Sequence, residues 1–218
     1  MSASARAWNR ERLASIRPGL GVLGEEASHA DPGLRARLER GGSYWVVDPL
    51  DGTNEFGEPG RSDWAVHVAL WERGELVAGA VALPDHGITF STDPAPPLPP
   101  TTRERPRLIT SRNRAPYAAI RVANELECDA VRLGSAGAKA MAVVIGEADI
   151  YVHDGGMYQW DSAAPAAVAM AAGLHASRID GSPLVYNQRD AWLPDFLICR
   201  PELAEPVLDA IWGDRRRR

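Results

Sequence analysis

The chain has 218 residues, of which 45% are hydrophobic and 24% charged, and its formal net charge is -5. This length can bury a core as one large domain or two small ones, and the near-average composition excludes a largely disordered chain. The negative balance, without a basic stripe along any face, excludes a general nucleic-acid binder.

Compartment and membrane association follow from the cysteines and the apolar runs. Cys128 and Cys199 lack metal-ligand spacing, as is usual in a reducing compartment. The first residues carry no apolar targeting core, and no run approaches the ~20 apolar residues of a membrane span. The sequence therefore predicts a cytoplasmic protein with no membrane partner. The arginines at 215–218 predict a solvated tail, with a role in tethering phosphate as the alternative.

The first half, residues 1–93, predicts a mainly antiparallel sheet. In chain order we expect a helix at 7–16 and strands at 21–23, 44–47, 64–71, 76–83 and 88–91. The third and fourth strands predict a hairpin, because Glu-Arg-Gly-Glu separates them. Residues 94–106 are rich in proline and predict an exposed connection.

The second half, residues 107–218, alternates between strand and helix patterns. We expect strands at 107–110, 131–133, 149–152, 175–178 and 196–199, and helices at 116–127, 136–145, 161–172 and 202–212. Such alternation predicts a layered α/β arrangement.

The stretch WVVDPLDGT is the most informative part of the chain. Asp48 ends an apolar run that predicts a buried strand, and Pro49 cannot donate a further ladder hydrogen bond. Asp51 and Gly52 favour a turn, after which Thr53 can open a helical turn. Two carboxylates are thus brought to one point.

This pair of aspartates predicts metal-assisted phosphate chemistry. Their spacing lets both carboxylates and the carbonyl of Leu50 face one cation. Hard divalent cations prefer oxygen ligands, and phosphate prefers N–H groups at a helix start. Because Asp48 follows Trp-Val-Val, it must be paired or metal-bound if it is buried.

Two further acidic positions allow a structural or a functional interpretation. Glu25 and Glu26 follow Gly24 at the end of a short strand, where a solvated turn is the alternative. Asp161 begins the alanine-rich helix, where aspartate is favoured as an N-cap. One of its oxygens can cap while the other binds a metal, so both roles stay open.

Lys139 is the only lysine in the chain. A bias toward arginine leaves lysine mainly where a compact ammonium is required, so Lys139 is a candidate for substrate contact. Chance survival on a helix surface is the alternative.

Three motifs in order carry a family resemblance: GEE, then WVVDPLDGTNEF, then WDSAAPAAVAMAAG. Together they resemble the inositol monophosphatase superfamily of magnesium-dependent, lithium-sensitive phosphatases. GSAGAKAMAV and HASRIDGSPLVYN are most similar to the CysQ-type 3'(2'),5'-bisphosphate nucleotidases of actinobacteria. The resemblance begins at about residue 20 and implies a layered α-β-α-β-α sandwich of the α/β (α+β) class.

The resemblance also implies roles for individual residues. The metal ligands of two or three Mg²⁺ ions would be Glu25, Asp48, Asp51, Asp161 and the carbonyl of Leu50. Thr53 and Glu25 would orient the attacking water, and the N–H groups of Gly52 and Thr53 would hold the phosphate. Two ions suit an in-line displacement without a phosphoenzyme.

The second phosphate of a nucleotide would lie near the start of the helix expected at 136–145. In the nucleotidases of this family a Gly-Ser-x-x-x-Lys segment contacts that phosphate, and Gly134, Ser135 and Lys139 have this arrangement. Ser135 can also cap the helix, with Lys139 one turn later on the same face. The expected substrate-binding residues are Leu50, Asp51, Gly52, Thr53, Ser135, Lys139 and Asp161.

The implied reaction is hydrolysis of the 3'-phosphate of 3'-phosphoadenosine 5'-phosphate to AMP and phosphate in sulfate assimilation. Inositol 1-phosphate and fructose 1,6-bisphosphate are alternative substrates. His153, Trp160 and Tyr186 are candidates for contact with adenine, although buried aromatic residues more often belong to the core.

Two other interpretations remain open. Family members usually begin with paired helices that this chain is expected to lack, which predicts poor solubility or a compensating homodimer contact, and allows an inactive relative that only binds Mg²⁺ or nucleotide. A haloacid dehalogenase-type phosphatase is disfavoured, because its paired aspartates stand two residues apart. Asp48 and Asp51 stand three apart.

Overall fold

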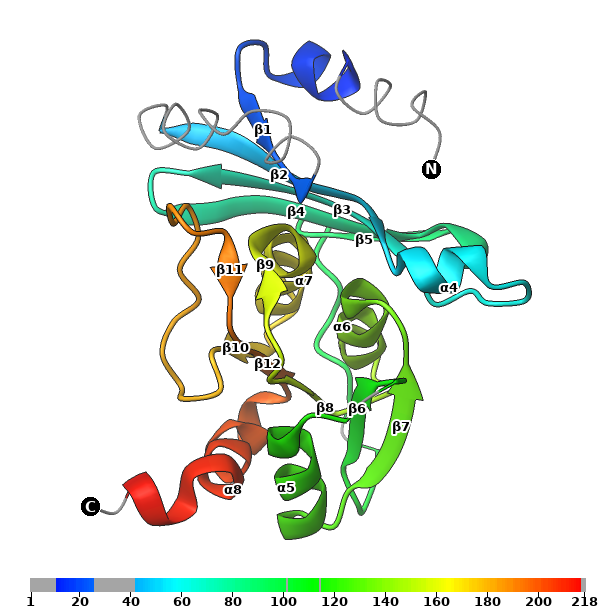
Figure 1. The fold of residues 1–218 in the computed structure, drawn as a ribbon, viewed down its shortest axis with the longest axis vertical. Helices are drawn as coiled ribbons and strands as arrows, with labels where there is room; N and C mark the ends of the chain where they lie inside the picture. The colour runs from blue at the N-terminus through cyan, green and yellow to red at the C-terminus, as the bar shows by residue number, and fades with distance from the viewer. Residues whose placement is uncertain (1–10, 26–41, 101, 114, 217–218) are drawn as a thin grey trace.

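The structure is a computed structural model that describes residues 11–25, 42–100, 102–113 and 115–216. Two five-stranded sheets lie on either side of the helices α6 (Ala136–Val144) and α7 (Gln159–Ala171), as Figure 1 shows. The helices α5 (Tyr117–Glu125) and α8 (Ala204–Arg216) cover the outer face of the second sheet. The outer face of the first sheet packs against Leu13 in the helical residues 11–16. The predicted α-β-α-β-α order is therefore confirmed.

The first sheet is a meander with one parallel edge. Its strands, in sheet order, are β1 (Gly21–Leu23), β2 (Ser43–Asp51), β3 (Ala65–Glu72), β4 (Glu75–Leu83) and β5 (Ile88–Ser91). Only the β1–β2 pair is parallel. Arg73 and Gly74, with φ of 53° and 103°, form the predicted hairpin turn. All five predicted strands of this half are thus confirmed.

The second sheet is parallel on one side and antiparallel on the other. Its order is β10 (His175–Ser177), β12 (Phe196–Cys199), β8 (Ile150–His153), β6 (Arg107–Ser111) and β7 (Asp129–Leu133). The strands β6, β7 and β8 run in parallel, so their carboxyl ends meet at one edge. Side chains alternate between the two faces: Ile109 and Tyr151 face the helices between the sheets, whereas Leu108 and Ile150 face α5 and α8.

Helix α7 owes its central position to small residues. It packs against β2, β3 and β4 on one side and β10 and β12 on the other. A Cβ added at Gly79 in β4 would lie 2.7 Å from the Cβ of Ala167, so a sheet strand and the helix approach as closely as side chains allow. One buried cluster therefore joins residues of both sheets.

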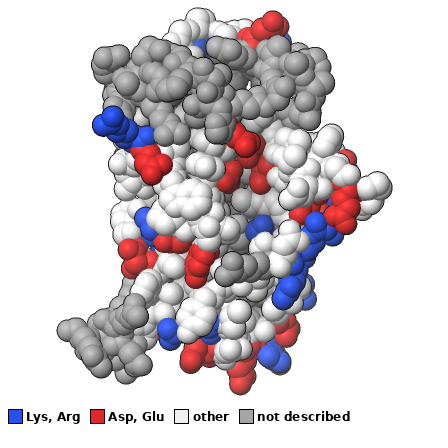
Figure 2. All heavy atoms as spheres, viewed as in Figure 1, with Lys and Arg blue, Asp and Glu red and all other residues white. Residues whose placement is uncertain are grey.

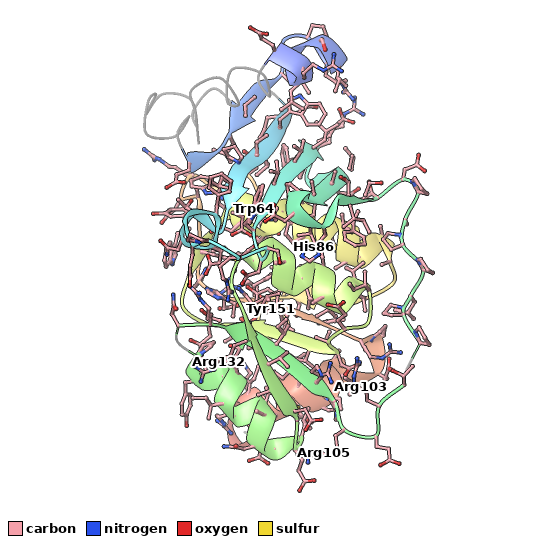
Figure 3. The ribbon with its side chains drawn as sticks, turned by 90° about the vertical axis from the view of Figure 1, so that its right-hand side faces the viewer. Trp64, His86, Arg103, Arg105, Arg132 and Tyr151 are labelled. Atoms are coloured by element: carbon pink, nitrogen blue, oxygen red, sulfur yellow. The ribbon has the colours of Figure 1, made fainter. Side chains whose placement is uncertain are left out.

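Residues 92–106 connect the sheets along one side of the molecule, and Arg103 and Arg105 lie near the lower end of this connection in Figure 3. The segment is mostly exposed, but Pro99 is buried and its carbonyl accepts a hydrogen bond from Arg200 at 2.5 Å. Arg103 pairs with the buried Asp149 at 3.4 Å. Within the part of the chain that the structure describes, no helix is long and apolar enough to cross a membrane.

Several elements differ from expectation. The prediction that the strand ends before Asp48 was wrong, because β2 continues to Asp51 with a register shift between these residues. Helix α7 begins at Gln159, two residues early. The short strands β9 (Met157–Tyr158) and β11 (Trp192–Leu193) were not expected, because two residues carry no periodicity. Residues 7–10 of the first predicted helix lie outside the described residues.

The remaining short elements are α4 (Thr53–Gly57) and two 3₁₀ turns, η1 (Pro84–His86) and η2 (Pro201–Leu203). Of these, α4 matters for the site, because it begins directly after β2. The helical turn predicted at Thr53 is confirmed.

Candidate active site

A cavity of about 330 Å³ opens between the end of β2 and the carboxyl ends of β6, β7 and β8. Its walls come from residues 51–55, 111–113 and 134–136, together with Lys139, Tyr151, His153, Gly156, Met157 and Asp161. The carboxyl edge of parallel strands is where α/β sheets usually bind ligands. Figure 2 shows acidic side chains around a recess in this face.

The end of β2 is shaped by its register shift. The N–H of Leu50 donates to Oδ1 of Asp48 at 2.9 Å, and the hydroxyl of Thr53 donates to the carbonyl of Leu50 at 3.2 Å. Gly52, with φ of 87°, adopts a left-handed conformation that glycine tolerates best, and it precedes α4. Asp51, Gly52 and Thr53 consequently line the cavity side by side.

Asp51 is the most strongly held of the site carboxylates. Its Oδ2 accepts hydrogen bonds from the hydroxyl of Ser135 at 2.5 Å and the N–H of Gly137 at 2.6 Å. The same oxygen lies 3.3 Å from Nε2 of His67. Burial opposes the ionisation of Asp51, but His67 and these two donors outweigh it and hold the pKa well below its ordinary value.

Asp48 and Asp161 have the opposite electrostatic balance. Burial, with the charge of Asp51, raises the pKa of Asp48 to about 6, although His67 opposes this. Burial and the charges of Asp51 and Asp48 raise the pKa of Asp161 to about 8. Asp161 is not the predicted N-cap but the third residue of α7, and its Oδ2 accepts the N–H of the N-cap residue Tyr158 at 2.8 Å.

His67 was missed in the sequence. Its side chain is fully buried in β3, where it lies opposite Asp48 in the register of β2 and β3. Its Nδ1 lies 3.2 Å from the carbonyl of Trp160. Burial lowers the pKa of His67, but the hydrogen bond and charge of Asp51 and the charge of Asp48 raise it by more, so the pKa is about 9. A Cβ at residue 137 would overlap with the imidazole, so only glycine fits there.

The donor set suits a hard divalent cation. Among the described residues, no three Asp, Glu, His or Cys side chains are already arranged as a metal-ligand cluster. Asp48 is nevertheless buried, Asp51 and Asp161 are partly buried, and the charge of Asp51 raises the pKa of the other two, so the three carboxylates lie close together. Carboxylate and carbonyl oxygens are the ligands that Mg²⁺ and similar ions take. The residues present therefore fit such an ion.

Glu25 lies at the same sheet edge as Asp48, because β1 and β2 run in parallel. Gly24 brings the two strands close: a Cβ there would overlap with the carbonyl oxygen of Val47. The side chain of Glu25 is exposed. Glu26 lies outside the described residues.

Lys139 is buried beneath the cavity, with 5% of its surface exposed, so the alternative of a surface lysine was wrong. Its Nζ donates to the carbonyls of Gly134 at 2.9 Å and Ser135 at 2.7 Å, and lies 5.4 Å from the ring centre of Tyr151. Figure 3 shows Tyr151 near the centre of the molecule. Burial lowers the pKa of Lys139 to about 8, although Asp51 and the other nearby carboxylates oppose this.

Ser135 has two partners for its hydroxyl. It donates to Asp51 and accepts the N–H of Ala138 at 3.0 Å, so the predicted helix cap is confirmed. The hydroxyl thus ties the carboxylate at the end of β2 to the start of α6.

A second group of charges was also missed in the sequence, because its partners are far apart in the chain. Glu55 in α4 is buried 3.4 Å from Nη2 of Arg112, and Nη1 of Arg112 donates to Glu58 at 2.5 Å. Asp63 pairs with Arg61 and accepts the N–H of Gly134 at 2.5 Å. The pairs of Arg112 hold α4 and the residue after it against the loop that follows β6, and Asp63 holds the segment after α4 against the turn between β7 and α6.

The three candidates for adenine contact separate into two groups. His153 lines the cavity and its Nε2 lies 2.9 Å from the carbonyl of Gly156. Trp160 and Tyr186 are buried in the core, where Trp160 stacks on Tyr158 and the hydroxyl of Tyr186 lies 3.3 Å from Ser162. For these two, the core interpretation is the correct one.

Comparisons with known proteins agree with this geometry. A sequence profile described as the inositol monophosphatase family matches residues 3–213. A 3'-phosphoadenosine 5'-phosphate phosphatase of Mycobacterium tuberculosis is 51% identical over 211 residues, which cover 92% of this chain and 76% of the relative. The 3'(2'),5'-bisphosphate nucleotidase CysQ of Escherichia coli K12 is 31% identical, with 85% and 78% covered.

Solved structures show the same fold. An inositol monophosphatase of Thermotoga maritima superposes with a TM-score of 0.75 at 20% identity, and covers all of this chain and 85% of its own. CysQ from Bacteroides thetaiotaomicron superposes with a TM-score of 0.69 at 24% identity, with 88% and 81% covered.

Proposed function

The chain belongs to the inositol monophosphatase family, and on this premise we propose that it hydrolyses the 3'-phosphate of 3'-phosphoadenosine 5'-phosphate to AMP and phosphate. The observation that supports this substrate best is the 51% identity to relatives that carry this activity in their name. A second observation is the buried ammonium of Lys139 at the cavity, beside the acidic edge of β2. The proposal places the enzyme in the cytoplasm, in sulfate assimilation.

Phosphatases of this family are metal-dependent, and we propose Mg²⁺ as the metal here. Its ligands would be the carboxylates of Glu25, Asp48, Asp51 and Asp161 and the carbonyl of Leu50. When bound, the metal would lower the pKa of water, which makes it a better nucleophile, and would neutralise charge on the phosphate oxygens. The charges of Asp48, Asp51 and Asp161 act on one another at this place, and such a cluster of carboxylates supports a cation there.

The chain's own groups would align the attack. Thr53 and Glu25 hold the attacking water, and the N–H groups of Gly52 and Thr53 hold the phosphate oxygens where α4 begins. Water attacks phosphorus from the side opposite the 3'-oxygen, which leaves with a proton to form the hydroxyl of AMP. Asp51 stays ionised through its hydrogen bonds to Ser135 and Gly137.

The second phosphate would lie over Lys139. Its ammonium is already fixed by two carbonyl oxygens, so its position is set before a substrate arrives. An ammonium held in a partly desolvated cavity attracts an anion more strongly than one in water. Asp161 and Ser135 would border the ribose and this phosphate.

Phosphate release tests the proposal. The purified chain is assayed with 3'-phosphoadenosine 5'-phosphate, inositol 1-phosphate and fructose 1,6-bisphosphate, with and without Mg²⁺ and with Li⁺ added. We expect the highest kcat/KM for the nucleotide, no turnover without a divalent metal, and inhibition by Li⁺. A higher kcat/KM for inositol 1-phosphate would show that the proposed substrate is wrong. The absence of turnover on any substrate with Mg²⁺ would support the inactive relative instead.

Association as a homodimer is a separate part of the proposal, carried over from the sequence. Light scattering of the purified chain over a range of concentrations tests it. A monomer at all concentrations would reject the dimer and leave the activity untouched.

A further inference from the structure

Besides groups for two phosphates, the cavity wall offers a base the partly buried ring of His153, whose Nε2 already lies 2.9 Å from the carbonyl of Gly156. Asp51 and Lys139 both line the cavity and both contact Ser135, whose hydroxyl donates to Asp51 and whose carbonyl accepts from Lys139. Tyr151 also lines the cavity, but its side chain is buried, and the ammonium of Lys139 lies over its ring. A nucleotide with both phosphates in the cavity therefore has its base at the rim.

An exposed tryptophan stands at that rim. Gly156 lines the cavity through its backbone, and a Cβ at this position would overlap with the six-membered ring of Trp192. The indole thus lies directly against the backbone that forms the cavity wall. Trp192 is 47% exposed, which is unusual for so large an apolar ring.

Tyr158 extends this aromatic surface. It pairs with Trp192 across β9 and β11, and it is 41% exposed. The two rings meet at 83° with 5.4 Å between their centres, so they form a corner. Tyr158 also stacks on the buried Trp160 at 4.7 Å and 11°. Figure 1 shows β9 and β11 side by side, facing the viewer next to α7.

Buried hydrogen bonds fix the segment that carries Trp192. Gln159 in the first turn of α7 is 1% exposed; its side-chain amide donates to the carbonyl of Asp190 at 3.1 Å and accepts the N–H of Asn187 at 2.8 Å. Its backbone N–H donates to the carbonyl of Ala191 at 2.8 Å. Asp161 follows in the same turn, so the aromatic corner and the acidic site share one rigid support.

We propose that Trp192 and Tyr158 are the residues on which the base of the nucleotide substrate stacks. This inference rests on the proposed function and names the specificity-determining residues of the same site. A base stacked on an aromatic ring covers apolar surface on both partners, and any purine has a face for it. The fixed rings need no ordering when the substrate binds, so the stacking energy goes into affinity.

Steady-state kinetics on matched variants test the inference. Trp192→Ala and Tyr158→Ala should each raise the KM for 3'-phosphoadenosine 5'-phosphate by about 5- to 100-fold, the range that loss of one stacked base gives, with little change in kcat. Activity on inositol 1-phosphate, which has no base, should stay as it is. Trp192→Phe should restore most of the affinity, because it keeps an aromatic face. Tyr117→Ala, at a 71% exposed tyrosine of α5, is the control.

Two results would overturn the proposal that the base stacks on Trp192 and Tyr158. An unchanged KM for the nucleotide in both alanine variants would show that the base lies elsewhere. Equal losses on both substrates would show that the rings only support the fold, a result that thermal melting of each variant would confirm.

Calorimetric binding of AMP and ribose 5-phosphate separates this inference from the proposed function. We expect the natural chain to bind AMP more tightly than ribose 5-phosphate, and Trp192→Ala to lose that difference. If the chain binds AMP and ribose 5-phosphate equally, the proposed stacking of the base is wrong even when the enzyme is active. If AMP binding depends on Trp192 but no nucleotide is hydrolysed, the proposed stacking is supported and the proposed reaction is wrong.

Discussion

The hydroxyl of Ser135 lies 2.5 Å from a carboxylate oxygen of Asp51, and this contact joins the end of β2 to the start of α6. The same hydroxyl caps α6 by accepting the N–H of Ala138. An acidic residue of the first sheet thus takes its final position only when the second half of the chain packs against it.

Ser135→Ala should weaken both the metal site and the helix. We expect Asp51 to lose one of its donors, which raises the Mg²⁺ concentration needed for half-maximal activity. Loss of the cap should lower the free energy of unfolding by about 1 kcal/mol. Metal titration of activity and urea unfolding measure the two effects. Ser182→Ala, at an exposed serine, serves as the control; a metal requirement equal to that of the natural chain would contradict the role given to Ser135.

Lys139→Ala should separate the two substrates. Truncating a charged hydrogen-bond donor at a phosphate costs about 2–3 kcal/mol, or roughly 30- to 150-fold in affinity. We therefore expect the KM for 3'-phosphoadenosine 5'-phosphate to rise far more than that for inositol 1-phosphate. Lys139→Arg should not restore the affinity for the nucleotide, because the buried space between Gly134, Ser135 and Tyr151 fits a compact ammonium. Equal changes for both substrates would remove the specificity argument.

Asp161→Asn should reduce metal affinity while α7 stays intact. The amide oxygen can still accept the N–H of Tyr158, so the cap survives, but the negative charge is lost. We expect Mg²⁺ binding by calorimetry to weaken about 10- to 100-fold or more, in line with the loss of a supporting or direct ligand. Asp129→Asn, where the carboxylate is 56% exposed, controls for net charge. Unaltered binding in Asp161→Asn would show that the acidic groups do not share a cation.

The metal-free chain should become less stable as pH rises. Asp48 and Asp161 have folded-state pKa values of about 6 and about 8, above the ordinary value of 3.8. Between these limits the folded chain holds protons that the unfolded chain has released, so the free energy of unfolding falls with increasing pH. His67, raised to about 9, acts in the same direction above its ordinary 6.5.

Mg²⁺ should reverse this trend, because a cation favours the ionised carboxylates. Thermal melting from pH 4 to pH 8, with chelator or with Mg²⁺, measures the effect. A metal-free Tm that rises steadily across this range would show that the carboxylates are not clustered in solution.

Gly79→Ala should destabilise the fold. The added methyl group meets Ala167 and the backbone of Ala164 in α7, and overpacking of this kind costs about 1–3 kcal/mol. Gly57→Ala is the matched control, because a Cβ there meets nothing within 4 Å. Urea unfolding compares the two. Similar stabilities would mean that α7 can move away from β4.

Much of the fold could be predicted because its signals are local. The runs that became β3 and β4 are apolar, end in turn residues and enclose Arg73 and Gly74, which the turn requires. By contrast, β9 and β11 exist only because Met157 and Leu193 are brought together by the tertiary fold. No pattern along the chain reports such a pairing.

The residues of the candidate site also fall into those that the sequence could predict and those that it could not. Asp48, Asp51 and Asp161 could be identified as candidates because each stands beside a recognisable apolar run or helix pattern in the sequence. His67 could not, because its role depends on the register of β3 against β2. Glu55 and Arg112 were missed for a related reason: their partnership joins α4 to a loop 57 residues away, from 55 to 112. The division of the chain at residues 94–106 stays a prediction.

Helix α7 lies between the sheets and contributes to a cluster that contains residues of both. Neither sheet can lose its order without exposing alanine and valine side chains that the other sheet also covers. Heat should therefore melt the described chain in one calorimetric transition, and inactivation should follow the same curve. Activity in a cell extract would then serve as a direct count of intact molecules.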